Sequence, residues 1–392
     1  MISRHRTTAN TTTTFDYGVI FYHNITVATN YFSTLGVETI IAPLGNSVTT
    51  YANLNGDAKG QTSAPSSVPW ANSTAAGDAL TRYVNLYNTQ FPFLDDGFSL
   101  PDPVPEDILL SWADFMAKFD LDAASLSAYQ VNEGVGNEMT LPAIYAMKYF
   151  SSLSAGGFLG IGPPLITTAD FNNQGIYDKA LNKLDQDAFL NVTITHITRN
   201  NDGVAVMMHT PDGKTTTVNA KQLVLAIPPV VADLRAIGLD LSPEEENLFG
   251  QASFRYYFDS VIQNTGLPDN VSIRNIDFAQ PNGIPTSDRM VLGVGKPGLL
   301  DGVPGLKALY YSSTSAISDA AAQADILATL AKYRAANGLD ASVEPVFAGF
   351  NNHEPYELTV PVDAIRNGYY KKEECAAGVS EYVVHGRGVA GA

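Results

Sequence analysis

Alternating apolar and polar positions predict short mixed elements at the start of the chain. Apolar, β-prone runs cover residues 15–22, 40–42 and 48–54 and predict short strands. Residues 25–35 carry apolar side chains at helical spacing, and Gly36 follows them, so we expect a short helix that ends there. The Ser-, Gly-, Ala- and Pro-rich stretch that comes next predicts a loop.

The next part of the sequence has a helical periodicity. Apolar residues recur every three or four positions, and the rigid Pro-rich tract PDPVP at residues 101–105 separates the first helix from the rest. Helices are expected over residues 78–87, 107–119, 123–131 and 141–150. A helical block of this size between two strand-rich regions is typical of a separate lobe.

The pattern then changes to alternation with a period of two. After a helix over residues 170–184, strands are expected at 189–198, 203–209, 215–219 and 222–227, and Asn-Asp-Gly and Asp-Gly turns separate the first three. Further expected elements are a helix at 242–249, strands at 254–263, 289–294, 306–312 and 343–350, and an amphipathic helix at 318–336. The order predicts a mixed α/β (α+β) fold that contains an antiparallel meander.

The composition of the chain disfavours several kinds of partner and excludes some structural features. The chain has 392 residues with 40 Asp and Glu against 23 Lys and Arg, a formal net charge of −17, which disfavours nucleic acid and anionic membranes as partners. The single cysteine, Cys375, excludes an intrachain disulfide. No apolar run is long enough to span a membrane, and residues 1–14 lack the apolar core of a signal peptide, so localisation stays open. A small-molecule substrate is the expected partner, and the oligomeric state is undetermined.

One glycine motif fits the literal dinucleotide pattern but not its context. Gly293, Gly295 and Gly298 follow a strand-like run, yet Pro297 lies inside the motif and a turn sequence follows it. A pyrophosphate-binding loop has to open a helix, so we interpret this motif as a turn between strands. The six histidines are scattered, and no hydrolase, P-loop or zinc motif occurs, so no metal site is predicted.

Four segments together carry a family resemblance. They are FDYGVIFYHN at residues 15–24, GFSLPDPVPED at 97–107, AIYAMKYF at 143–150, and the meander sequence from 191 to 229, which ends in Ala-Ile-Pro-Pro. On these segments the chain resembles the FAD-dependent, flavin-containing amine oxidoreductases of the β-cyclopiazonate dehydrogenase type. The resemblance covers about residues 15–371.

The resemblance implies a fold and a reaction. It implies an incomplete FAD/NAD(P)-binding Rossmann-like domain (residues 15–60 and 165–250) interleaved with a helical and sheet substrate domain (75–160 and 251–350). It also implies FAD as cofactor and hydride transfer to it from an amine or related compound. In that family a G-x-G-x-x-G segment precedes the Asp-Tyr-Gly stretch, which here lies close to the start. We therefore expect that this segment is missing, that residues 351–392 form an altered end, and that FAD binding is impaired.

The resemblance also assigns residues. Those expected beside the isoalloxazine ring are Gly18, Val19 and Phe21, and those expected beside the adenosine part are Ile194, Ala226 and Pro228. His23 is the candidate catalytic residue, because a titrating group near a flavin can take a proton; a histidine packed at a strand end is the alternative. Two other interpretations of the whole chain stay open: a truncated or degenerate non-catalytic paralogue, and a small-molecule binding module.

Overall fold

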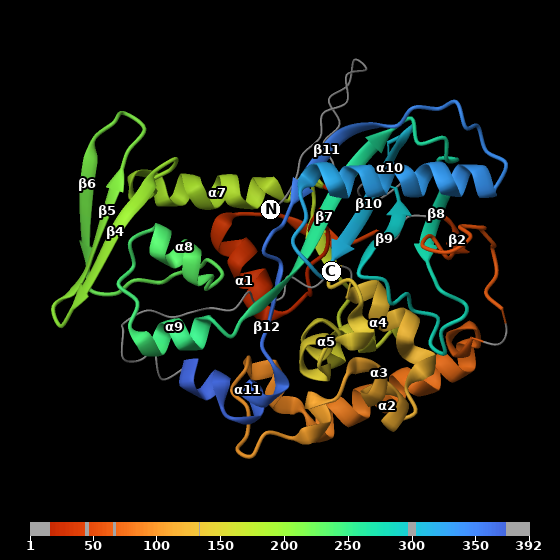
Figure 1. Ribbon diagram of the computed structural model, residues 1–392, viewed down its shortest axis with the longest axis horizontal. Helices are drawn as coiled ribbons and strands as arrows, with labels where there is room; N and C mark the ends of the chain where they lie inside the picture. The colour runs from red at the N-terminus through yellow and green to blue at the C-terminus, as the bar shows by residue number, and fades with distance from the viewer. Residues whose placement is uncertain (1–15, 44–46, 66–67, 133, 297–302, 374–392) are drawn as a thin grey trace.

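The main body of the protein is a mixed β-sheet. The computed structural model describes residues 16–43, 47–65, 68–132, 134–296 and 303–373, and the largest sheet in this part of the chain has seven strands. Its strands are β2 (Val48–Ala52), β7 (Ser253–Gln263), β8 (Val271–Asn275), β9 (Arg289–Gly295), β10 (Leu306–Ser313), β11 (Val346–Asn352) and β12 (Glu357–Thr359). The order is β11-β7-β10-β9-β8-β2, with β12 also paired to β7 (Figure 1). All pairs are antiparallel except β2 with β8.

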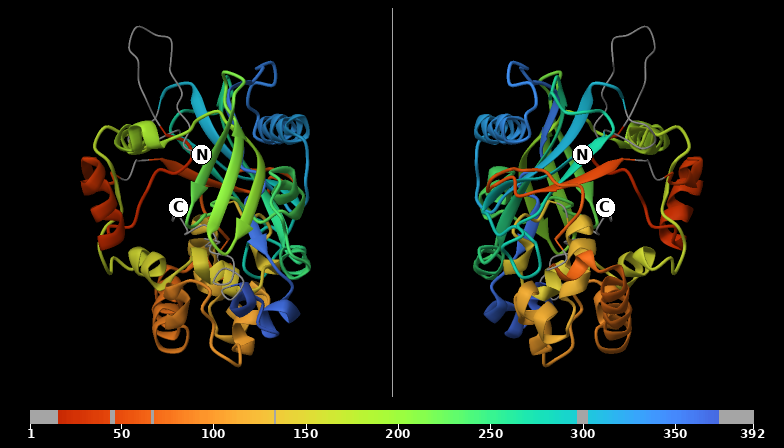
Figure 2. Two further views of the ribbon diagram at one scale, coloured as in Figure 1. Left: turned by 90° about the vertical axis from the view of Figure 1, so that its left-hand side faces the viewer. Right: turned by 90° about the vertical axis from the view of Figure 1, so that its right-hand side faces the viewer.

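Helix α10 (Asp319–Ala336) seals one face of this sheet. Ser318, where the sequence predicted the helix to begin, caps its start by accepting a hydrogen bond from the Ala321 N–H at 3.2 Å. Its buried residues Ile326 and Leu330 pack with Phe258 and other apolar side chains of the sheet. Figure 2 shows α10 on one side of the sheet, with α1 (Thr26–Leu35) and α7 (Gln174–Leu184) on the other. The sheet therefore has one sealed face and one face that points toward α1 and α7.

A helical block forms the lower part of the molecule in Figure 1. Its α-helices are α2 (Ser73–Gln90), α3 (Trp112–Lys118), α4 (Ser125–Val131), α5 (Ala143–Tyr149) and α6 (Ser152–Phe158). The expected helix over 107–119 is in fact split into the 3-10 turn η3 (Glu106–Leu109) and α3. The reason is a backbone exchange with a distant segment: the Trp112 N–H donates to Leu141 O at 2.7 Å.

The predicted meander forms a separate antiparallel sheet. Its strands are β4 (Thr193–Asn200), β5 (Gly203–His209) and β6 (Thr215–Ala220), and the last two begin where the sequence placed them. The strand expected at residues 222–227 does not form. No described residue pairs with it, and Val224 and Ile227 are 56% and 43% exposed.

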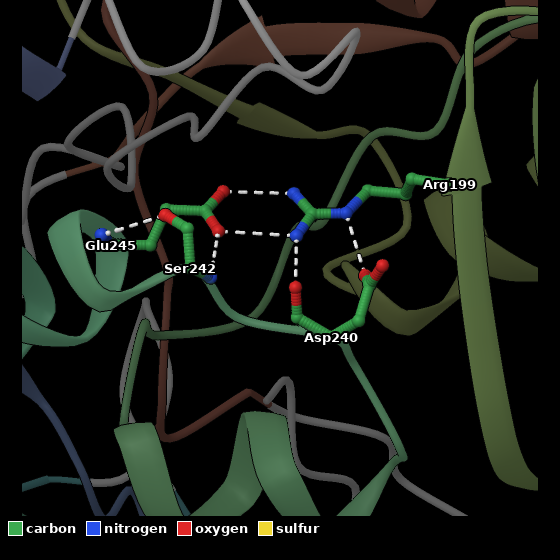
Figure 3. Close-up of polar contacts among 4 residues, drawn as sticks. All are labelled: Arg199, Asp240, Ser242 and Glu245. Carbon is green, nitrogen blue, oxygen red and sulfur yellow. Dashed lines mark hydrogen bonds and ion pairs between the residues drawn. The ribbon is translucent and has the colours of Figure 1, made fainter.

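An ion-pair cluster ties the meander to helix α9 (Pro243–Phe249). Arg199 of β4 donates from its Nη1 and Nη2 atoms to the two carboxylate oxygens of Glu245, at 2.8 and 3.1 Å, and from Nε to Asp240 at 2.8 Å (Figure 3). Glu245 also accepts from the Ser242 N–H in a capping box that starts α9. Both oxygens of the Glu245 carboxylate therefore accept hydrogen bonds.

The remaining elements are short. α1 ends at Gly36, whose φ of 64° is the left-handed cap that the sequence predicted. β1 (Thr39–Ile41) pairs with β3 (Ile166–Thr168), and α8 (Val231–Ala236) and α11 (Val362–Arg366) complete the helices. The apolar run expected as a strand at 15–22 makes an isolated bridge, Tyr22 with Ile166, rather than a ladder. Every helix in the described ranges is too short or too polar to reach across a lipid bilayer.

Candidate active site

The face of the main sheet that points away from α10 carries the candidate site, and we call it the open face. Alternate residues of a strand point to opposite faces, so Phe258 faces α10 while Tyr257 and Asp259 face away from it. Cross-strand pairing arranges the open face in rows, about 7 Å apart. The first row is Gly349, Val261 and Ala308, the second is Asn351, Asp259 and Tyr310, and the third is Tyr257 and Ser312.

Tyr17 covers the first row. It is 3% exposed and packs in one cluster with Val261 and Ala308. Its hydroxyl lies so close to Gly349 that a Cβ at that position would be 2.4 Å from the Tyr17 oxygen. A glycine is therefore needed on β11 for the ring to lie against the sheet.

Residues 16–24, which we call the strap, run from the open face to the helical block. The N–H of Asn173 donates to the Asp16 carboxylate at 2.9 Å, and the Asn173 side chain donates to the carbonyl of Val19 at 2.8 Å. At the other end, His23 Nε2 lies 3.3 Å from the hydroxyl of Ser154 on α6. No described residue accepts a hydrogen bond from the backbone N–H groups of residues 18–21. These amides are available to a ligand.

Burial lowers the pKa of His23. Desolvation disfavours the imidazolium, so the ring stays neutral in the strap and can accept a proton. Its described polar partner is the Ser154 hydroxyl. His23 therefore has the protonation state that a base needs, but among the described residues no carboxylate pairs with it to stabilise the charged form.

A cluster of rings lies on the second and third rows. Tyr257 and Tyr310 are parallel within 10°, with centroids 6.4 Å apart. His353 stacks on Tyr257 at 5.3 Å, and Tyr356 lies 4.9 Å from the same ring. The three tyrosines are half-buried, and the His353 side chain keeps 9% of its surface exposed. The four rings form one continuous cluster, with Tyr257 in contact with the other three.

A buried carboxylate lies beside these rings. Asp259 is 0% exposed, and its Oδ2 lies 2.9 Å from His353 Nε2. Its other oxygen accepts a hydrogen bond from the side chain of Asn351 at 2.5 Å. The backbone N–H of His353 donates to the carbonyl of Tyr257 at 2.9 Å, which fixes the histidine next to the third row.

The loop at residues 134–137 covers the third row from the other side. Gly134 has a φ of 99°, and a Cβ there would be 2.8 Å from Tyr356 and 3.1 Å from the Tyr257 ring. Arg255 holds this loop by donating to the carbonyls of Val135 at 2.9 Å and Asn137 at 3.2 Å. The second row thus lies between Tyr17 on one side and this loop on the other.

Glu138, at the end of the same loop, is a second buried carboxyl group. It is 0% exposed, and no described cation forms an ion pair with it. Burial raises the pKa of Glu138 to about 8, against a smaller lowering by the amide of Asn132. The group is therefore mostly protonated at neutral pH.

The residues assigned from the sequence fall into two groups in the structure. Gly18, Val19, Phe21 and His23 lie together on the strap. Ile194 is half-buried on β4, Ala226 is exposed and Pro228 is half-buried, all on the meander side. No hydrogen bond between described residues joins the two groups.

Sequence reasoning missed the pair formed by Asp259 and His353. Each half carries a local signal: an acidic residue inside the mostly apolar strand FRYYFDSVIQ, and a histidine followed by Glu-Pro. Their contact joins positions 94 residues apart, so neither half predicts the other.

Comparison with known proteins decides the family. No family model matches the chain. The FAD-dependent oxidoreductase oblC of Cochliobolus heterostrophus is 31% identical over 375 residues, which cover 92% of this chain and 73% of that protein. The chain belongs to this family of FAD-dependent oxidoreductases. Beta-cyclopiazonate dehydrogenase of Aspergillus oryzae is 28% identical over 364 residues, which cover 92% of this FAD-dependent oxidoreductase and 74% of the relative.

Solved structures show the same fold. A CLA-producing fatty acid isomerase from P. acnes superposes with a TM-score of 0.72 at 17% identity, covering 98% of this chain and 84% of that one. Putrescine oxidase bound to putrescine gives 0.57 at 15% identity, covering 93% and 81%. The predictions of a mixed α/β fold and of an FAD-dependent oxidoreductase family are confirmed.

The residues present fit two parts of FAD. The amides of residues 18–21 can donate to the nitrogen and oxygen atoms along a flavin edge. The exposed apolar side chains of Val224 and Ile227, on either side of Ala226, suit a flat adenine. The described residues of this FAD-dependent oxidoreductase do not fit the pyrophosphate, because no glycine-rich loop among them leads into a helix.

The literal glycine motif does not supply that loop. Gly293 and Gly295 lie on β9, which is antiparallel to its neighbour β10, so the motif joins two adjacent strands. The turn that the sequence predicted after the motif falls largely on residues 297–302, which include Gly298 and lie outside the described residues.

Proposed function

We propose that this chain oxidises a small organic substrate, an amine or a related compound, by hydride transfer to FAD, and that the reaction takes place between the strap and the open face. The observation that supports this most directly is the position of Tyr17. It lies on the first row of the open face and immediately precedes Gly18 and Val19, so the segment proposed for the flavin edge begins beside the ring cluster.

We propose that the chain's own residues bind and orient the two reactants. Gly18, Val19 and Phe21 would hold the isoalloxazine edge through backbone N–H groups and apolar contact, and Ile194, Ala226 and Pro228 would contact the adenosine part. The bound flavin supplies the hydride acceptor. Asn173, which fixes the strap at both Asp16 and Val19, would keep the strap amides in place.

The domain division follows the same proposal. Residues 15–60 and 165–250 would form the cofactor side, and residues 75–160 and 251–350 the substrate side. Within 351–392, residues 374–392 lie outside the described structure. The proton acceptor would be one of two histidines, His23 on the strap or His353 on the open face.

Flavin binding tests this proposal. In equilibrium dialysis against FAD, the compartment with the purified chain should hold the higher flavin absorbance, and added FAD should raise the melting temperature, because a ligand that binds the folded state alone stabilises it. Replacing Val19 by Asp should abolish both effects, and replacing the exposed Val27 of α1 by Asp should not. Equal flavin absorbance in both compartments and an unchanged melting temperature would contradict the proposal and favour a non-catalytic paralogue.

A further inference from the structure

We infer that residues 134–138, which we call the cover, form a pH-sensitive lid on the third row of the open face. Protonated Glu138 holds the cover closed, and ionised Glu138 releases it. The inference concerns the cover alone, and it holds whether or not the chain binds FAD.

The cover packs tightly on the sheet and contains two backbone hinges. A Cβ on Gly136 would be 2.9 Å from the Ser312 hydroxyl, so this residue approaches the third row as closely as Gly134 does. Both glycines have a positive φ, 71° for Gly136 and 99° for Gly134, a region that glycine enters without steric cost. The backbone of the cover can therefore turn at two positions when the contact that holds it down is lost.

That contact lies at the C-terminal end of the cover. Glu138 is 0% exposed, and neither of its carboxyl oxygens forms a well-aligned hydrogen bond with a described residue. Its polar neighbour is the side-chain amide of Asn132, which is 1% exposed. A protonated carboxyl group matches this amide, because its O–H can donate to the amide oxygen while its carbonyl accepts from the amide N–H. An ionised carboxylate has no hydrogen to donate and leaves the amide oxygen unpaired.

The charged and titratable side chains around the cover do not compensate an ionised Glu138. On the sheet side they are Arg255, Tyr257 and Tyr356, and Asp288 in the segment before β9 lies near Arg255. Arg255 donates to two carbonyls of the cover and forms no described ion pair with Glu138. Burial is the main cause of the raised pKa of Glu138, and no described charged group contributes to it.

Ionisation therefore favours the open cover. The pKa of Glu138 is about 8 in the closed cover, and in an opened, solvated cover it returns toward its ordinary 4.5. Between these two values, the ratio of open to closed cover rises by up to about tenfold per pH unit, and above about pH 8 the ratio levels off. Access to the third row would increase over the same pH range.

Thiol reactivity measures the open fraction. The experiment uses the full chain with its single cysteine replaced (Cys375→Ala), one new cysteine, and 4,4′-dithiodipyridine as the reagent. Val135→Cys reports on the cover, because Val135 is 1% exposed, and Val27→Cys, at a 72% exposed position, gives the rate of an accessible thiol at each pH. The ratio of the two rates should rise by up to about tenfold per pH unit from about pH 6 to about pH 8, and Glu138→Gln should make it flat.

Unfolding of the whole chain would also release Glu138, so a cysteine in the core separates the two events. Ala322 of α10 is 0% exposed and lies in the core cluster on the sealed face of the sheet. Ala322→Cys should react about tenfold or more slowly than Val135→Cys at every pH, because local opening needs less free energy than global unfolding.

Hydrogen exchange provides a second measurement that needs no cysteine. At any one pH between about 6 and 8, the amides of the cover should exchange faster in the parent than in Glu138→Gln, and the amides of α10 should exchange far more slowly in both proteins. Comparison at the same pH removes the pH dependence of the exchange chemistry itself.

Three outcomes would overturn the inference. They are a flat rate ratio in the parent, a rise with pH that persists in Glu138→Gln, and equal rates for Val135→Cys and Ala322→Cys. The last result would mean that the chain opens as a whole and that the cover does not move by itself.

Discussion

Two glutamates of this protein are almost completely buried, and their surroundings differ. Glu245 faces the guanidinium of Arg199, which bonds both of its oxygens, and the Ser242 N–H bonds one of them again. Glu138 is also buried, but its described polar neighbour is the amide of Asn132. A buried charge is tolerated when a cation and hydrogen bonds replace the lost water. The first carboxyl group keeps its charge and joins two elements, and the second keeps its proton.

Removal of the Arg199 side chain should cause the largest loss of folding stability. Arg199→Ala would leave the Glu245 carboxylate buried without compensation, which costs about 3–5 kcal/mol of unfolding free energy. Urea unfolding followed by circular dichroism measures it. A loss below about 1 kcal/mol would mean that water reaches Glu245 freely and that the contrast with Glu138 is false.

Glu138 should make stability depend on pH in a defined direction. Its pKa is raised from 4.5 to about 8 in the folded chain, so the protonated group favours folding fully below about pH 4.5. As the pH rises, the unfolded chain loses its proton first, and stability falls by up to about 1.4 kcal/mol per pH unit until about pH 8.

Glu138→Gln should flatten that slope in urea unfolding measured across the same pH range. Glu106 provides the control: its surface carboxyl group has a pKa lowered by Arg366, so Glu106→Gln should leave the slope in place. A Glu138→Gln protein with the parent's slope would show that the folded chain holds this group ionised.

The double variant Arg199→Ala/Glu245→Gln should recover part of the loss caused by Arg199→Ala. With a neutral amide at position 245, no buried charge is left unpaired, because Asp240, the other partner of Arg199, is 46% exposed. Coupling between contacting residues is about 0.5–3 kcal/mol. The same urea experiment, run on all four members of the cycle, gives this coupling. Additive losses would indicate that Arg199 acts through packing instead of charge.

The smallest effect is expected at the surface. Arg235 pairs with Glu246 at 2.7 Å, but their side chains are 61% and 37% exposed. Arg235→Ala should cost about 0.2–1 kcal/mol, as exposed ion pairs do. The Arg235 ion pair differs from the Arg199 ion pair mainly in burial. A similar loss of stability in Arg235→Ala and Arg199→Ala would therefore show that burial does not explain the large effect expected for Arg199→Ala.

Local signals predicted much of the fold. The Asn-Asp-Gly turn placed β5, and Ser318 and Gly36 marked helix ends, because each depends on residues next to it in sequence. Long-range contacts were not predictable. The break between η3 and α3 depends on hydrogen bonds to the segment before α5, and β2 pairs with β8 more than 200 residues later.

The candidate site likewise has a part that the sequence predicted and a part that it did not. The strap residues came from a family resemblance carried by continuous sequence, whereas Asp259 and His353 meet through strand pairing that no single segment encodes. A histidine and an aspartate in separate segments have no pattern in common. Only the register of β7 against β11 brings them together.

The difference between the sealed face and the open face of the main sheet also has a consequence for the evolution of such proteins. α10 supplies the packing on one face, so exchange of half-buried side chains on the other face leaves the core cluster between α10 and the sheet in place. Selection can then act on those positions while the scaffold persists. A sheet built in this way confines the cost of such a change to one of its two faces.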